Sequence, residues 1–425
     1  MQRLIGVAGI FVILGIAWLL SNNKKRINFR VVIWGILLQI VFALIILKTT
    51  PGQAVFSGAR VAITKLLSFT DHGASFLFGN IYFGDEGIVK EVGASYGRNG
   101  ALQVFDSATG EFINIGIIFA FHILPTIIFF ASLMSILYHM GVMQRIVQLF
   151  AWIMTKFMGV SGAESLSAAS NIFVGQTEAP LVVRPYVSEM TMSELTAIMT
   201  GGFATVAGGV LAAYVRFGID AGHLLAASVM SAPAALVMAK IVFPEVEEPK
   251  TAGVVKIAIE KKTVNIIDAA ATGAADGLKL ALNVGAMLMA FLAIIAMINY
   301  FLGLAGLSLK QIFGYIFSPL AFFMGVDFKD LLTFGNLLGT KISLNEFVAY
   351  VNLGEVKDTI SPRTFIIATY ALCGFANFGS IGIQLGGIGG IAPERRHDLA
   401  KLGLRAMFAG ALASWLTATI AGILI

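Results

Sequence analysis

The long apolar segments of this chain most constrain what it can fold into. A helix needs about 20 mostly apolar residues to cross the hydrocarbon core of a bilayer. Only 12% of the 425 residues are charged, too few to cover the surface of a soluble protein. Lipid leaves only helices and closed barrels as spanning structures, and the chain lacks the short alternating strands of a barrel. The sequence therefore predicts an all-α polytopic membrane protein of about eight transmembrane helices, at residues 5–22, 31–47, 112–144, 196–215, 221–239, 280–309, 364–393 and 406–425.

Basic residues between these segments predict the orientation of the chain. They gather after the first, fifth and seventh segments, and alternating spans put all three connections on one side. The positive-inside rule makes that side cytoplasmic, so both termini and residues 49–110 are predicted to lie outside. The net charge of +5 is explained by topology, and no nucleic-acid partner is expected. The basic residues are Lys24, Lys25, Arg26 and Arg30, then Lys250, Lys256, Lys261 and Lys262, then Arg395, Arg396, Lys401 and Arg405.

Two connections contain apolar stretches that are too short to cross. An amphipathic piece at 143–158 precedes a stretch at 161–187, and a second piece at 307–324 precedes a stretch at 331–351. Stretches of this length indicate re-entrant hairpins. An unwound hairpin tip survives at membrane depth only where it lines a cavity in the protein. The predicted tips are NIFVGQTE at 171–178 and NLLGTKISLNE at 336–346.

Each hairpin is followed by a span with a related interruption. The first contains GFATVAG at 202–208 and the second GFANFGS at 374–380. These spans are three apart in order and run in opposite directions, so the repeat is inverted, as in secondary transporters. The predicted division is N-terminal spans with an outside segment (1–110), a first repeat (111–244), a cytoplasmic linker (245–275) and a second repeat (276–425).

A carboxylate at membrane depth is costly unless it faces a cavity or a partner. Glu178 and Glu346 are therefore candidates for binding a solute rich in hydroxyl or N–H donors, because carboxylates only accept hydrogen bonds. The alternative is that the polar side chains only join helices to one another. The neighbouring candidates, which offer donors and acceptors or an apolar wall, are Gln176, Thr177, Asn377, Ser380 and Phe375.

A cation site is predicted beside the first hairpin. The side chains of Asn171 and Thr205 and the freed carbonyls of Val174 and Val206 form a set of oxygen ligands. Hard cations prefer oxygen, and the C-terminal ends of half-helices attract them. The alternative for Thr205 is a hydrogen bond to its own helix.

The strings at 171–180, 201–208, 344–350 and 373–384 resemble those of the bacterial concentrative nucleoside transporter family. The resemblance implies a homotrimer in the bacterial inner membrane. It implies a scaffold of the early spans and the sixth, and a moving transport domain that contains both hairpins. It also implies import of nucleosides such as uridine or adenosine by elevator-type alternating access. Sodium drives this import in the favoured interpretation and protons in the alternative.

The same resemblance implies roles for individual residues. Gln176, Thr177 and Glu178 contact the base, with Val210 nearby. The residues that contact the ribose are Glu346, Asn377 and Ser380, and the ring of Phe375 lies close to the ligand. The sodium ligands are Asn171, Val174, Thr205 and Val206.

Two other functions are less well supported by the sequence. The chain has no H-E-x-x-H motif, and its G-x-S-x-G string at 93–97 lies in the predicted outside segment, to which we assign no chemistry. An enzyme is therefore not expected, and no organic cofactor is predicted. A channel for small polar solutes needs a continuous pore. Two occluding hairpins favour a carrier.

Overall fold

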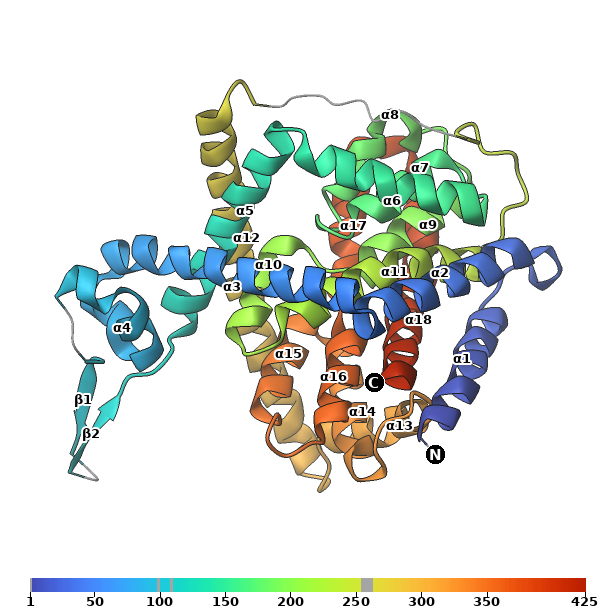
Figure 1. Cartoon of the computed structure of the whole chain (residues 1–425). Helices are drawn as coiled ribbons and strands as arrows, with labels where there is room; N and C mark the ends of the chain where they lie inside the picture. Colours follow the sequence, from blue (N-terminus) through green and yellow to red (C-terminus); the bar gives the residue numbers. More distant parts are fainter. Residues whose placement is uncertain (1, 98–99, 108–109, 254–262) are drawn as a thin grey trace.

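A computed structural model describes residues 2–425 apart from 98–99, 108–109 and 254–262 (Figure 1). Within those residues, seven helical stretches are long and apolar enough to cross a membrane. The seventh predicted span, 364–393, is instead two shorter helices. The seven are α1 (Gln2–Leu19), α2 (Phe29–Lys48), Phe119–His139 including α5 (Leu124–His139), α9 with α10 (Met192–Ala204 and Gly208–Arg216), α11 (Ala221–Val242), α12 (Ile266–Gly303) and the stretch that ends with α18 (Arg396–Leu424).

The predicted outside segment contains both a long helix and a hairpin. Figure 1 shows α3 (Thr50–Phe78) leading away from α2 to a lobe with α4 (Glu86–Val92) and the antiparallel strands β1 (Gln103–Asp106) and β2 (Glu111–Asn114). The third span was predicted from residue 112, which is wrong, because β2 occupies that position and the helix begins at Phe119. The predicted linker is also too long, since α12 begins at Ile266, and Lys256, Lys261 and Lys262 lie outside the described residues.

Both amphipathic pieces and both hairpins are present. In the first half, α6 (Val142–Met158) precedes α7 (Gly162–Ser170), the turns at 171–178 and α8 (Arg184–Val187). In the second half, α13 (Leu309–Phe323) precedes α14 (Leu331–Ser343) and α15 (Glu346–Glu355). The second tip was predicted to unwind from Asn336, which is wrong, because α14 stays helical to Ser343. Asn345 then begins α15 by accepting a hydrogen bond from the Val348 N–H at 2.9 Å.

The base of the first hairpin is fixed by a buried ion-pair cluster. The Lys240 ammonium, in the last turn of α11, lies 2.6 Å from the Glu164 carboxylate on α7 and 3.1 Å from that of Glu245. It also donates to Ser193 Oγ at 2.8 Å. Removing one partner of such a group leaves an uncompensated buried charge, so the cluster holds α7 firmly against α9 and α11.

The two interrupted spans touch at their breaks. The first break separates α9 from α10, and the second separates α16 (Pro362–Leu372) from α17 (Phe378–Ile391). Gly374 has a φ of +123°, and a Cβ there would lie 2.5 Å from the Phe203 carbonyl oxygen. Only glycine allows this approach. The spans that come after the two broken spans, α11 and α18, pack on each other, so the two halves interlock.

The remaining spans cover this centre from two sides. Helix α1 packs on α18 and α2 packs on α11, whereas α5 packs along α12. Gly273 and Gly277 of α12 allow that contact, because a Cβ would lie 2.7 Å from the backbone of α5 at Gly273 and 2.8 Å from it at Gly277. The Arg3 guanidinium donates to the Ile425 carbonyl at 2.6 Å, so the two termini lie close together.

We predict that Gly374→Ala disrupts the contact between the two breaks. The new methyl group meets backbone atoms, and the left-handed φ adds about 1–3 kcal/mol of strain. The unfolding midpoint of the purified protein should fall by several degrees, measured by thermal denaturation in detergent. Gly382→Ala in α17 is the matched control, since its Cβ meets no atom within 4 Å. Equal midpoints for the two variants would contradict the prediction.

Candidate functional site

A chain of buried polar side chains joins the two hairpin tips. It begins at Tyr214 on α10 and passes through Glu346, Asn377 and Ser380 to Gln176 in the first tip. Every member is less than one-tenth exposed. Four of the predicted ligand-binding residues therefore lie together, although they come from both halves of the sequence.

The Glu346 carboxylate is held by two donors. The Tyr214 hydroxyl donates to Oε1 at 3.1 Å and the Asn377 amide donates to Oε2 at 3.1 Å. Tyr214 is fixed by ring contacts with Tyr350 and Phe347, at centroid distances of 4.2 and 5.4 Å. The sequence offered no signal for Tyr214, because only the folded chain brings it to Glu346. The carboxylate keeps acceptor capacity for hydroxyl donors of a ligand.

A helix cap positions the next two members. Asn377 is the N-cap of α17, and its Oδ1 accepts a hydrogen bond from the Ser380 N–H at 2.9 Å. Asparagine is a preferred N-cap because its oxygen satisfies a free N–H at the helix start. The cap turns the Asn377 amide nitrogen to Glu346 and leaves Ser380 Oγ to accept from Gln176 at 3.2 Å.

Gln384 was not singled out from the sequence and completes the chain. Its amide nitrogen donates to Gln176 Oε1 and to the Met199 carbonyl, both at 3.0 Å. Its own Oε1 is buried without a partner among the described residues. Gln384 lies one helical turn after Ser380, a spacing that places both on one face of α17. That spacing is the sequence signal from which Gln384 could have been predicted.

The other predicted ligand residues lie at the edges of this chain. Thr177 packs on α17, where a Cβ at Gly387 would lie 2.9 Å from its methyl group. Val210 is buried in α10 and Phe375 is half-buried at the second break. Glu178 is exposed, and within the described part of the chain its side chain accepts no hydrogen bond. Glu178 therefore does not join the buried chain that includes Glu346.

The predicted cation ligands gather beside the first break. Asn171 is fully buried, and its Oδ1 has no partner among the described residues. Its amide nitrogen lies 3.1 Å from where a Cβ of Gly201 would be, and Thr205 Oγ1 donates to the Gly201 carbonyl at 2.9 Å. The bond of Thr205 to its own helix is thus present. Val206 is buried and Val174 half-buried, and the Phe173 carbonyl accepts from the Gly208 N–H at 3.1 Å, which ties the tip to the break.

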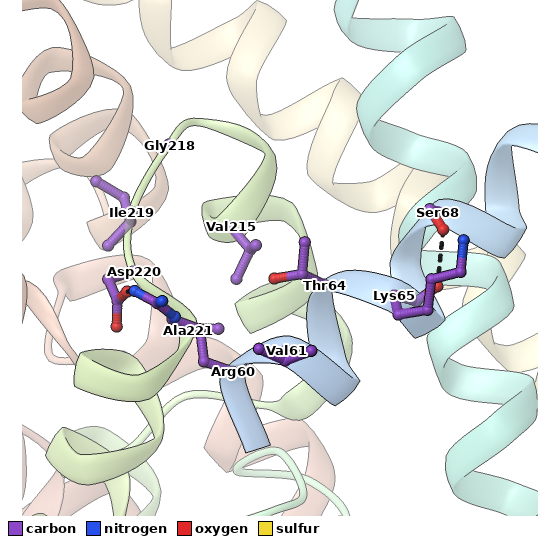
Figure 2. A pocket seen from close by; sticks show the side chains of 10 residues that line it. All are labelled: Arg60, Val61, Thr64, Lys65, Ser68, Val215, Gly218, Ile219, Asp220 and Ala221. Atoms are coloured by element: carbon purple, nitrogen blue, oxygen red, sulfur yellow. Dashed lines mark hydrogen bonds and ion pairs between the residues drawn. The ribbon is translucent and has the colours of Figure 1, made fainter. Parts of the chain in front are cut away.

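An open groove of about 610 Å³ lies elsewhere, between α3 and the α10–α11 turn (Figure 2). The Arg60 guanidinium and the Asp220 carboxylate pair across it at 3.1 Å, and Arg216 on α10 pairs with Asp71 on α3 at 2.6 Å. The pKa of Asp220 is lowered, because the His223 N–H and Arg60 together outweigh the burial that raises it. The groove shares no residue with the polar chain, so it is not the candidate site.

Three family models match this chain. A model described as the C-terminus of Na⁺ dependent nucleoside transporters matches residues 223–422, and one described as their N-terminus matches residues 8–81. A third, described as nucleoside recognition, matches residues 120–221, which include the first hairpin.

Whole proteins also resemble the chain. It is 44% identical to the uncharacterized transporter YutK of Bacillus subtilis over the full length of both. It is 42% identical to the human sodium/nucleoside cotransporter 1 and spans 64% of that protein's length. Among solved structures, an inward-facing substrate-bound state of CNTnw matches with a TM-score of 0.88 at 41% identity, covering 100% of this chain and 98% of that one. An outward-facing variant of CNTnw also matches with a TM-score of 0.88, at 40% identity over the same shares.

We predict that Tyr214→Phe weakens ligand binding without loosening the fold. The ring keeps its packing, but Glu346 loses one of its two donors. The KM of nucleoside uptake should rise about tenfold, which corresponds to about 1.4 kcal/mol. Tyr350→Phe is the control, because the Tyr350 hydroxyl donates to the Thr369 carbonyl, whereas the donors to Glu346 are Tyr214 and Asn377. An unchanged KM in Tyr214→Phe would show that this hydroxyl does not shape the site.

Proposed function

This chain belongs to the concentrative nucleoside transporter family, and we propose that it takes up nucleosides together with sodium through the polar chain between its two hairpins. It is a multi-pass membrane protein that couples nucleoside transport to a cation. The related structures include both inward- and outward-facing states, in keeping with alternating access. Its relatives are transporters, and we assign it no catalysis.

The observation that supports this site best is the continuous chain from Glu346 to Gln176. A nucleoside has hydroxyl donors at one end and a base with donors and acceptors at the other. Glu346, Asn377 and Ser380 suit the hydroxyls of the ribose, whereas Gln176 suits the edge of the base. Thr177, Glu178, Val210 and Phe375 border the same place. We propose that Glu178 turns toward the base when the ligand binds.

Sodium is the proposed coupling ion, and Asn171, Val174, Thr205 and Val206 are its proposed ligands. The buried free oxygen of Asn171 supports this choice, because a buried acceptor without a partner costs about 1–3 kcal/mol. A sodium ion there would supply the missing interaction and would join the first tip to the first break. Proton coupling is the alternative, although a proton needs a titratable group and these four residues offer none.

The packing favours a revised division into a fixed and a moving part. We propose that α5 and α12 form the scaffold, because they pair along their length. The early spans α1 and α2 were expected in the scaffold but pack on α18 and α11, so we place them with the moving transport domain. Much of α12 is uncovered, including Met289 at 77% exposed. A homotrimer with α12 facing neighbouring protomers is therefore the proposed assembly.

The proposed location is a bacterial inner membrane with both termini outside. The three basic connections support this orientation through the positive-inside rule. The hydrogen bond between Arg3 and Ile425 supports a shared side for the termini.

The function is tested by uptake of labelled uridine and adenosine into proteoliposomes. Sodium and proton gradients are imposed separately, and saturable uptake is expected with the sodium gradient alone. Glu346→Gln and Glu178→Gln should lower it more than about tenfold, since each replaces an acceptor by a group that also donates. Glu189→Gln, which alters an exposed carboxylate after the first hairpin, is the control.

Each alternative has its own outcome in this experiment. Uptake driven by the proton gradient alone would contradict sodium coupling. Flux that rises linearly with nucleoside and ignores both gradients would indicate a channel. Full activity in both glutamine variants would contradict the proposed binding site.

We predict that Thr205→Val raises the sodium concentration needed for half-maximal uptake about tenfold, because one oxygen ligand is lost. The maximal rate at saturating sodium should change little. Thr196→Val is the matched control, since Thr196 is also fully buried and bonds its own helix, at the Met192 carbonyl, away from the break. Equal sodium dependence of the two variants would remove Thr205 from the ion site.

A further inference from the structure

The last turn of α14 contains a lysine with no exposed surface. The Lys341 ammonium donates to the Ala371 carbonyl at 2.9 Å, to the Cys373 carbonyl at 3.3 Å and to Ser414 Oγ at 3.1 Å. A lysine has three N–H donors, so each has a partner. None of the ion pairs formed by the described residues includes Lys341. Its charge is therefore held entirely by neutral oxygens.

Two of these oxygens, the Ala371 and Cys373 carbonyls, lie where α16 ends at the second break, and the third belongs to Ser414 on α18. The carbonyls of a last helical turn lack donors within the helix, and the helix dipole places partial negative charge there. Transporters use such half-helix ends to bind coupling cations. The Lys341 ammonium occupies one of them as a cation would, except that it is attached to the chain.

The first half has an equivalent position without a lysine. Gly201 and Cys373 each stand directly before the shared Gly-Phe-Ala, so they correspond in the repeat. Asn171, at the end of α7, lies against Gly201, as Lys341, at the end of α14, lies against Cys373. Among the described residues, no lysine or arginine donates to Asn171, whose Oδ1 is buried and free.

We propose that Lys341 is a tethered cation that fills, in the second half, the position that the exchangeable sodium takes in the first half. This inference rests on the proposed sodium site at Asn171 and Thr205. Lys341 is a positioning residue, because it touches the broken span and not the ligand. It keeps the second tip and the Glu346 side of the site assembled whether or not sodium is present. Sodium then orders only the first tip.

One test compares thermal unfolding of the full-length purified protein in sodium chloride and in choline chloride at equal ionic strength. Lys341→Asn gives the second hairpin the side chain that the first has at Asn171. It also removes the ammonium, so that its position at the second break is empty. Its midpoint should fall by several degrees in choline and recover in sodium by more than the wild type does. Lys341→Met keeps the length without charge or ligand oxygen, and its midpoint should fall in both salts. Lys329→Met, exposed just before α14, is the control.

Two results from these variants would overturn the proposal. One is a sodium response in Lys341→Asn equal to that of the wild type. The other is a wild-type midpoint in Lys341→Met. A wild type without any sodium response would overturn the sodium site as well, so the two failures can be told apart.

A second measurement uses only the wild type, so it tests the proposal even if neither variant folds. Hydrogen–deuterium exchange of the wild type is compared in sodium and in choline. Sodium should slow exchange in peptides covering 168–178 and 201–208 and leave those covering 336–346 and 371–377 unchanged. Equal protection of both sets would overturn the proposal, because the second half would then also await a free cation.

Discussion

The free backbone groups at two helix breaks are the constraint on which the centre of this protein depends. An unpaired N–H or carbonyl in a membrane interior costs several kcal/mol, so a broken span survives only where other groups satisfy it. Here the Gly208 N–H reaches the Phe173 carbonyl of the first tip, and Lys341 reaches the Ala371 and Cys373 carbonyls. The hairpins therefore have a structural role, which is to satisfy the backbone groups at the breaks, in addition to their role in the proposed binding site.

The binding site follows from those same partners. Asn377 starts α17 with its oxygen and offers its amide nitrogen to Glu346 with the other end of the side chain. Ser380, whose N–H is the one capped, presents its hydroxyl to Gln176. A group that satisfies the backbone thus fixes the direction of a group that meets the ligand. This explains how two distant hairpins can present polar atoms along one line.

The sequence predicted these features where the signal was local. Gly-Phe-Ala followed by polar residues marked both breaks, and the first tip was placed correctly at 171–178. The second tip was predicted too early, because the polar residues from Asn336 onward favour unwinding, whereas buried contacts such as that of Lys341 satisfy them within a helix. Tyr214 reaches Glu346 across 132 positions of sequence, and no local pattern predicts that pairing. Glu178 has the sequence context of a buried carboxylate but lies exposed at the tip.

The inverted repeat provides two equivalent places, and a few side chains make them unequal. In the first half a neutral amide oxygen waits beside the break and the carboxylate of Glu178 is exposed. In the second half an ammonium is already bound and the carboxylate of Glu346 already has two donors. Side chains that already have hydrogen-bond partners before a ligand arrives lose little conformational entropy when it binds. The second half can therefore act as a preformed platform, while the first half completes its interactions only when ion and solute are both present. In the proposed sites, the ion and the nucleoside both contact the first hairpin, at Asn171 and Gln176, so coupling between them needs no long path.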